Sequence, residues 1–358
     1  MTVRLIDAEL VSPVRSQTVY HAVGYAMDEA TPDTILLVSP ASPYVSIGYH
    51  QDAEREVDLA FCDAEGLPVV RREVGGGAVY LDSGQIFCQW VFHRGHLPAS
   101  VDERFRLYVQ PLVETYRALG VPAYYRPIND IHVAGKKIGG IGAATLGESE
   151  IVVGSLMLDF NFELMARVLK VSSEKMRDKV HQSLQEYMTT LTRQLGQTPD
   201  RAAVKALYVA KCAETLNTDI ALDVLSPIEE AKAEELDHLF ASPEWLYQKG
   251  GLRQSGVKIH ADVRVVEGAH KAPGGLIRVV AQLQGDCIED VSISGDFTVQ
   301  PVDSVSKLET ALRGTRVETS EIAARVSEWY ESLGVQSPGV MVDDWVQAVT
   351  RVNDTSHT

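Results

Sequence analysis

Two arginines precede a run of three glycines in the segment RREVGGGAVYLD, residues 71–82. Consecutive glycines leave backbone N–H groups open to a phosphate or a carboxylate, because no side chain obstructs the approach. Paired guanidinium groups donate to the same anion and keep their charge. The pattern favours an anion-binding site at Gly75, Gly76 and Gly77, although a glycine-rich hairpin with surface arginines would show the same residues.

The glycine run differs from the common nucleotide-binding loops. No Ser or Thr follows the lysines of Gly135-Lys136-Lys137, so the P-loop pattern is absent. The residues after the glycines have the pattern of a strand, whereas a dinucleotide-binding loop would lead into a helix. A nucleotide bound here therefore requires a different type of fold.

A second candidate is the lysine pair in NDIHVAGKKIGG, residues 129–140. A lysine on a strand beside glycines can stabilise a carboxylate that attacks a phosphate, because its ammonium is compact enough to lie between two anions. Asn129 and Asp130, just upstream, could orient Mg²⁺ or a phosphate-bound water. The alternative is a solvated hairpin in which the lysines have no chemical role.

Hydrophobic periodicity indicates the elements that position these residues. We expect helices over 16–30, 57–66 and 101–120, strands over 34–40, 44–50 and 85–92, and four short strands joined by glycine turns after residue 122. The stretch from 161 to about 215 is mostly helical in pattern. Because strands and helices occur in clusters, we predict an α+β fold with a mostly antiparallel mixed sheet.

A break near 245–260 precedes three alternating segments and three amphipathic helices, which indicates a small α+β unit with its own core. The formal net charge of −16 argues against nucleic acid or an anionic membrane as the main partner. The four cysteines are widely spaced, no secretory or membrane-spanning segment is evident, and we expect a cytoplasmic monomer.

Three segments carry a family resemblance: RREVGGGAVYLD, NDIHVAGKKIGG and VVGSLMLDFNFELMARVL, in this order. They resemble the signature blocks of the lipoate–protein ligase A family, which is grouped with biotin ligases and octanoyltransferases. The resemblance implies a catalytic core like that of class II aminoacyl-tRNA synthetases and biotin ligases. It also implies a catalytic, acyl-adenylate-forming domain over 1–250 and the accessory C-terminal domain of bacterial ligases over 258–352.

The resemblance also implies roles for individual residues. Lys137 corresponds to the family's catalytic lysine, and Asp130 could also contact Mg²⁺. The positions that match the family's ATP and acyl-substrate contacts are Arg72, Gly75, Gly76, Gly77, Ala78, Val79, Tyr80, Asn129, Asp130, Gly154, Ser155 and Lys179. Lys179 aligns only loosely, with a mobile adenylate-binding loop.

The activity implied is ligation of lipoate to a lysine of a carrier protein, with ATP and Mg²⁺ as cofactors and lipoyl-AMP as intermediate. The carrier could be an E2 lipoyl domain, a glycine-cleavage H-like protein or a lipoate carrier of sulfur metabolism. The sequence departs from the family pattern at Leu81, at Val152-Val153 and at Gly139-Gly140. These departures concern substrate detail more than reaction class.

Three alternatives remain on the same scaffold. An octanoyl- or lipoyltransferase needs a cysteine nucleophile and no ATP. The stretch 138–160 contains no cysteine, and Cys88 lies in an apolar run typical of a buried strand. A non-catalytic lipoyl-binding protein would have no need of a phosphate site. A biotin ligase would carry a G-R-G-R-x-G-R loop, which is absent.

Overall fold

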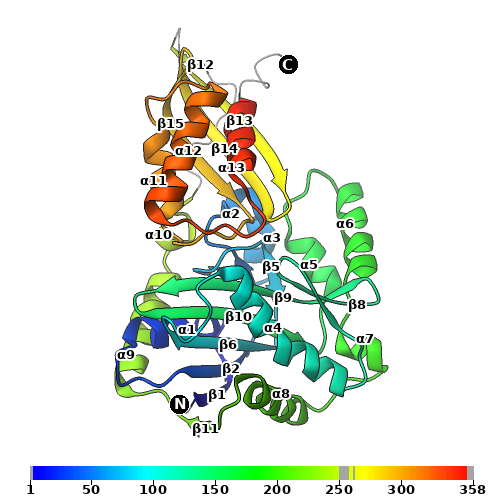
Figure 1. Ribbon diagram of the computed structural model, residues 1–358. Helices are drawn as coiled ribbons and strands as arrows, with labels where there is room; N and C mark the ends of the chain where they lie inside the picture. The colour runs from blue at the N-terminus through cyan, green and yellow to red at the C-terminus, as the bar shows by residue number, and fades with distance from the viewer. Residues whose placement is uncertain (1–2, 250–257, 261–262, 353–358) are drawn as a thin grey trace. The chain divides into compact units, whose positions relative to one another are not determined.

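The computed structural model describes residues 3–249, 258–260 and 263–352 (Figure 1). These residues form two compact units. The first contains the chain up to Ser46 together with Val57–Arg72 and Val79–Trp245. The second contains Ile47–Glu56, Glu73–Ala78 and the chain from Leu246 onward. Each unit has a hydrophobic core of its own.

The first unit is built on a mixed sheet of eight strands. Their spatial order is β11 (Ile220–Asp223), β1 (Val3–Val11), β2 (Thr34–Pro40), β6 (Gln85–His93), β10 (Ser149–Met157), β9 (Lys136–Leu146), β8 (Asp130–Val133) and β7 (Tyr124–Arg126). Only the pairs β11–β1 and β1–β2 are parallel; all the others are antiparallel. The predicted fold class is therefore confirmed.

Helices cover both faces of this sheet. Successive side chains of a strand point to opposite faces, so burial of the whole central strands requires cover on each side. On one face Trp90, Phe92 and Val152 pack with α4 (Val101–Ala118) and α8 (Arg201–Leu216). On the other face Val91 and Ile151 lie against α1 (Arg15–Ala26), which packs on α9 (Pro227–Phe240). This two-sided cover explains why β2 and β6 are buried almost throughout.

Shorter elements complete the first unit. A three-stranded sheet has the order β4 (Val69–Arg71), β3 (Tyr44–Ile47) and β5 (Val79–Leu81). The helices α3 (Leu59–Ala64), α5 (Phe162–Val168), α6 (Glu174–Tyr187), α7 (Leu191–Leu195) and α10 (Pro243–Leu246) are also present; only the last residue of α10 belongs to the second unit. Most of 161–215 is thus helical, as predicted.

The second unit has an antiparallel sheet covered by helices. The strands follow the order β12 (Lys258–His260), β13 (Val263–Ala272), β14 (Gly275–Gln284) and β15 (Cys287–Gly295). The helices α11 (Ser304–Leu312), α12 (Thr319–Leu333) and α13 (Val342–Thr350) contribute Trp329 and Trp345 to the core. The short helix α2 (Ala53–Glu56) also belongs here through Arg55, whose guanidinium binds Glu267 at 2.7 and 3.0 Å.

The units are discontinuous in sequence, whereas the sequence pattern predicted one boundary near residue 250. Residues 47–56 and 73–78 cluster with the C-terminal chain because they bond to it directly. Gly295 donates its N–H to the His50 carbonyl at 3.0 Å. The strand expected over 44–50 accordingly ends at Ile47. Within the described residues, no helix combines the length and the apolar character that crossing a membrane requires.

Candidate functional site

The lysine pair lies on a tight hairpin between β8 and β9. Ala134 and Gly135 form the turn with φ values of 49° and 79°, the positive values that a two-residue hairpin turn needs. Lys137 pairs with His132 across the hairpin, next to a bulge between Ile131 and His132. Its ammonium reaches Oδ1 of Asp130 at 2.6 Å. The hairpin therefore joins two of the residues expected at the site.

The second carboxylate oxygen of Asp130 also has bonding partners. Oδ2 accepts a hydrogen bond from the Tyr187 hydroxyl at 3.2 Å and lies 3.5 Å from Nε2 of His132. Arg126 donates to the same Tyr187 hydroxyl, also at 3.2 Å. The carboxylate thus lies in a network in which Lys137 and Arg126 carry positive charge.

Glycines leave the space that the Lys137 side chain occupies. A Cβ atom on Gly140 would lie 3.3 Å from the Lys137 Nζ, so glycine at this position leaves room for the ammonium. A Cβ on Gly154 would lie 3.0 Å from the Gly140 carbonyl oxygen, which explains glycine on the neighbouring strand. Ser155 is half-buried beside it, and Asn129 accepts a backbone bond from Ile141 at 2.9 Å. Asn129 and Gly154 thus lie next to Gly140, the residue over which the Lys137 ammonium lies.

The two lysines have different surroundings. Lys136 donates to the carbonyl of Gln185 near the end of α6 at 3.3 Å. The Lys137 carbonyl accepts the N–H of Thr189 at 2.9 Å, just beyond the same helix. The end of α6 is therefore bonded directly to the lysine hairpin.

The paired arginines also differ. Arg71 is fully buried. Its Nε donates to the Trp245 carbonyl at 3.0 Å, and its backbone carbonyl accepts the Trp245 indole N–H at 2.9 Å. Arg72 donates to the Ser46 hydroxyl at 3.2 Å. Burial lowers the pKa of Arg72 to about 10, against the opposing influence of Tyr20 and Tyr44, so it remains charged at neutral pH. Arg71 has a structural role, and Arg72 remains the candidate for an anion.

The triple glycine has a packing role within the second unit. A Cβ on Gly75 would lie 2.5 Å from the Phe297 carbonyl oxygen and 2.8 Å from the Thr298 Cα. Gly76 has φ 94° and donates to the same Phe297 carbonyl at 3.4 Å. Close backbone approach thus explains Gly75 without a ligand. Because Gly75, Gly76, Gly77 and Ala78 cluster with the second unit and Lys137 with the first, their meeting at one anion stays a prediction.

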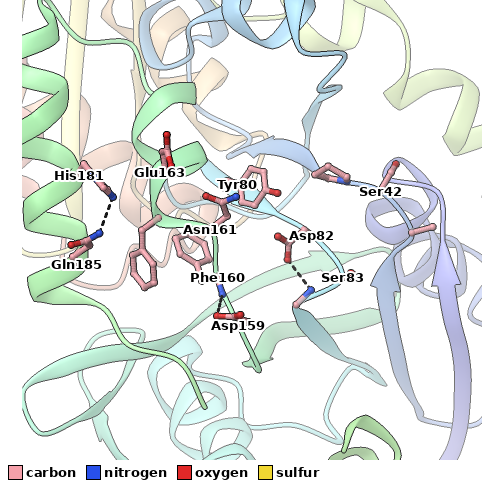
Figure 2. A pocket seen from close by; sticks show the side chains of 14 residues that line it. Ser42, Tyr80, Asp82, Ser83, Asp159, Phe160, Asn161, Glu163, His181 and Gln185 are labelled. Atoms are coloured by element: carbon pink, nitrogen blue, oxygen red, sulfur yellow. Dashed lines mark hydrogen bonds between the residues drawn. The ribbon is translucent and has the colours of Figure 1, made fainter. Parts of the chain in front are cut away.

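A cavity of the first unit has a volume of about 740 Å³ (Figure 2). Its lining residues are Ala41, Ser42, Pro43, Tyr80, Asp82, Ser83, Gly84, Asp159, Phe160, Asn161, Phe162, Glu163, His181 and Gln185. Tyr80 is the one predicted site residue among them. The other aromatic and acidic members lie mostly in LDFNFE, residues 158–163. This stretch belongs to the third block of the family resemblance, but its aromatic and acidic side chains were not among the predicted site residues.

Two electrostatic features mark this cavity. Asp82, Asp159 and Glu163 give it an acidic lining. Burial, with the charge of Asp82, raises the pKa of Tyr80, so the phenol stays protonated. The aromatic and acidic surface suits an uncharged or cationic heterocycle with hydroxyl groups, and is unfavourable for phosphate.

Two further predicted contact residues, Val79 and Lys179, are not among the residues that line this cavity. Val79 is half-buried on β5, where it pairs with Ser46. Lys179 is exposed on α6. The segment that aligned with a mobile loop is helical from Glu174, with Ser173 as a side-chain cap. The role of Lys179 stays a prediction.

The structure provides no ready metal site at Asp130. Its two oxygens already face Lys137 and Tyr187. Among residues 3–249, 258–260 and 263–352, no group of three or more His, Cys, Asp or Glu side chains is arranged to hold a metal ion. A magnesium role for Asp130 therefore stays a prediction, and no reaction step is derived from it.

The cysteines of the first unit are poor nucleophiles. Cys88 is fully buried on β6, and burial raises its pKa well above the ordinary value. Burial likewise raises the pKa of Cys62 to about 11 and that of Cys212 to about 12. Because the thiolate is the reactive form, these residues are structural. The prediction that Cys88 packs in the core is confirmed.

Comparison with known proteins agrees with this geometry. Residues 17–213, more than half of the chain, match the lipoyl protein ligase A/B catalytic domain. The chain belongs to this family. Residues 266–337 match the bacterial lipoate protein ligase C-terminus. The recognition made from the three sequence blocks is therefore confirmed.

The similar proteins of this family include both ligases and transferases. Lipoate-protein ligase A subunit 1 of Thermoplasma acidophilum is 30% identical over 68% of this chain and 95% of its own length. Lipoate–protein ligase 2 of Staphylococcus aureus is 26% identical over 83% of this chain and 84% of its own. Octanoyltransferase LipM of Kyrpidia tusciae is 28% identical over 64% of this chain and 95% of its own length. Membership of this family therefore indicates an enzyme of the lipoate ligase or octanoyltransferase type, without deciding between the two.

Two solved structures are also similar. A bipartite lipoate protein ligase of T. acidophilum, described with its E2 lipoyl domain, gives a TM-score of 0.64 at 28% identity and covers 72% of this chain and 100% of its own. A lipoate-protein ligase A bound with ATP gives a TM-score of 0.61 at 25% identity and covers 69% of this chain and 99% of its own.

Proposed function

We propose that this protein is an ATP-dependent lipoate–protein ligase that forms lipoyl-AMP and passes the lipoyl group to a lysine of a carrier protein. The observation that carries the proposal is the Lys137 ammonium, which lies over Gly140 and beside Asp130, in a unit whose cysteines all have raised pKa values. Charge stabilisation is available there, whereas a thiolate nucleophile is not. The ATP-bound relative supports the same reaction.

The first step would join lipoate to AMP. A lipoate carboxylate oxygen attacks the α-phosphorus of ATP, the bond to the β-phosphate oxygen breaks, and pyrophosphate leaves with the electron pair. Lys137 would stabilise the negative charge on the phosphate and carboxylate oxygens in the transition state. Arg72, charged and half-buried, is the second cation proposed for the adenylate.

The second step would transfer the acyl group. The neutral amine of the carrier lysine attacks the lipoyl carbonyl carbon, the bond to the phosphate oxygen breaks, and AMP leaves while the new amide loses a proton. Lys137 would stabilise the carbonyl oxygen and the departing phosphate. Exclusion of water would protect the mixed anhydride from hydrolysis.

The 740 Å³ cavity is the proposed site for the adenosine half of ATP. The rings of Tyr80, Phe160 and Phe162 can pack against a purine. The carboxylates of Asp82 and Glu163 can accept hydrogen bonds from ribose hydroxyls or the exocyclic amine. Because the acidic lining repels phosphates, it would direct the triphosphate out of the cavity. Val79, Asn129, Gly154, Ser155 and Lys179 remain proposed contacts.

We propose an E2-type lipoyl domain as the carrier. The support is the relative of T. acidophilum described with its E2 lipoyl domain. The other carriers suggested by the resemblance, an H-like protein and a sulfur-metabolism lipoate carrier, remain to be compared directly as substrates. Relative rates of lipoylation of the three carrier types by the full chain measure this preference.

The competing transferase function has support from the similar octanoyltransferase. The test is the ATP requirement. The purified chain is incubated with lipoate, a lipoyl domain and Mg²⁺, with or without ATP, and in parallel with an octanoyl-loaded carrier protein but no ATP. We expect lipoylation only with ATP, together with lipoate-dependent exchange of pyrophosphate into ATP. ATP-independent octanoyl transfer without pyrophosphate exchange would overturn the ligase proposal.

A further inference from the structure

Tyr187, the last residue of α6, connects two charged residues of the lysine hairpin region. Its hydroxyl accepts a hydrogen bond from Arg126 Nη1 and donates one to Asp130 Oδ2, each at 3.2 Å. A guanidinium only donates and a carboxylate only accepts, so the single hydroxyl proton must point to Asp130.

This bond fixes the carboxylate that contacts Lys137. Asp130 binds Tyr187 through Oδ2 and the Lys137 ammonium through Oδ1, at 2.6 Å. Rotation of a carboxylate about χ2 has only broad, shallow preferences, so its orientation depends on such partners. Without the hydroxyl, Asp130 could turn and carry the ammonium with it.

We propose that Tyr187 is a positioning residue for Lys137, acting through Asp130; the inference rests on the proposed function of Lys137. A backbone hydrogen bond supports this role, because the Lys137 carbonyl accepts the Thr189 N–H at 2.9 Å, just beyond α6. The same helix places His181 and Gln185 in the cavity lining (Figure 2). The end of α6 thus links the proposed nucleoside cavity to the proposed catalytic lysine.

The chain provides a matched control in Tyr124. Its ring lies 6.2 Å from the ring of His132, and that of Tyr187 lies at 5.7 Å. The exposed fractions of the two residues are 42% and 43%. In the described part of the chain, no hydrogen bond joins the Tyr124 hydroxyl to Asp130. The two tyrosines therefore differ mainly in the hydrogen bonds that join the Tyr187 hydroxyl to Asp130 and Arg126.

The experiment compares Tyr187→Phe and Tyr124→Phe in the full chain. We expect Tyr187→Phe to lower kcat by about 10- to 100-fold in lipoate-dependent pyrophosphate exchange, because small misplacement of a catalytic group has effects of this size. KM for lipoate and for ATP should stay within about twofold, since the interaction acts in the transition state. Tyr124→Phe should resemble the wild type.

Two further measurements distinguish positioning from a general structural effect. In the Asp130→Ala background, Tyr187→Phe should cause little additional loss, because the side chain that joins Tyr187 to Lys137 is absent. The rate at which acetic anhydride labels Lys137, followed by mass spectrometry, should change in Tyr187→Phe and stay unchanged in Tyr124→Phe.

An unchanged kcat in Tyr187→Phe, or an equal loss in the Asp130→Ala background, would overturn the inference. If the wild type shows no ATP-dependent exchange at all, the proposed function fails instead. The labelling rate then still decides whether Tyr187 positions Lys137: a change supports positioning, and identical rates overturn it.

Discussion

Adjacent residues of the same type have different roles in this protein, as the two lysines of the hairpin show. Lys136 donates to a carbonyl near the end of α6, and Lys137 faces Asp130 over Gly140. The sequence could indicate a charged hairpin beside glycines. Which lysine faces the carboxylate depends on strand register and on the bulge next to His132, which residue types alone do not define.

Replacing Lys137 by Ala should slow both half-reactions strongly, whereas Lys136→Ala should retain most activity. The loss expected for one key donor to a developing charge is about 10²- to 10³-fold in kcat. The measurements are pyrophosphate exchange for adenylation and transfer from chemically prepared lipoyl-AMP for acylation. Equal losses in the two variants would show that general charge in the hairpin, and not the position of Lys137, is what matters.

His21 should make stability depend on pH. It is buried on α1, and burial lowers its pKa to about 3, whereas an unfolded histidine titrates near 6.5. Between these values only the unfolded state binds the proton. The contribution of neutral His21 to the free energy of unfolding is therefore complete above about pH 6.5. It decreases as pH falls below this value, by up to about 1.4 kcal/mol per pH unit.

The free energy of unfolding of the first unit, measured by urea denaturation from pH 5 to pH 7, tests this dependence. His21→Gln should flatten the slope, while His238→Gln, at an exposed position of α9, should leave it as in the wild type. A slope that persists in His21→Gln would assign the effect to other groups.

At the scale of elements, strands with strong apolar patterns could be predicted closely. The expected strand over 34–40 matches β2, and that over 85–92 matches β6 within one residue. β11 was not predicted, because this edge strand is four residues long and leaves Leu222 exposed, which gives no alternating pattern. Its parallel pairing with β1 depends on a chain reversal through α8, which local patterns do not encode.

A buried ion pair fastens β1 to α9. Arg4 donates through Nη1 to Glu229 at 3.2 Å and through Nε to Thr34 at 2.7 Å, and both charged residues are almost fully buried. Glu229 also accepts the Ser226 N–H in a capping box. Glu229→Ala should destabilise the first unit by about 3–5 kcal/mol, because it leaves a buried charge without its main partner.

Urea denaturation measures that loss, and two comparisons define its origin. The double variant Arg4→Met/Glu229→Leu should recover much of it, because no buried charge remains. Glu214→Ala, which removes an exposed pair with Lys211, should cost no more than about 1 kcal/mol. A similar loss in Glu229→Ala and Glu214→Ala would contradict the assignment of the Arg4–Glu229 pair as a buried anchor.

At the scale of the whole molecule, short segments from the N-terminal half belong to the second unit. Sequence patterns place 47–56 and 73–78 among the strands that flank them, because local periodicity reports secondary structure and not distant packing. Only the structure shows that residues 75–76 lie against Phe297 and Thr298. The glycine run thus has a structural requirement in addition to the proposed anion contacts.

Gly75 and Gly77 should respond differently to the same added methyl group. At Gly75 the Cβ would lie 2.5 Å from backbone, so Gly75→Ala must displace residues 73–78 from the 297–298 segment. At Gly77 the nearest atom would be the Asp296 Cβ, at an ordinary 3.7 Å. Hydrogen–deuterium exchange should therefore increase at 73–78 and 296–298 in Gly75→Ala and remain at the wild-type level in Gly77→Ala. If both variants exchange like the wild type, Gly75 is not constrained by this packing, and anion binding would be the remaining explanation for glycine at position 75.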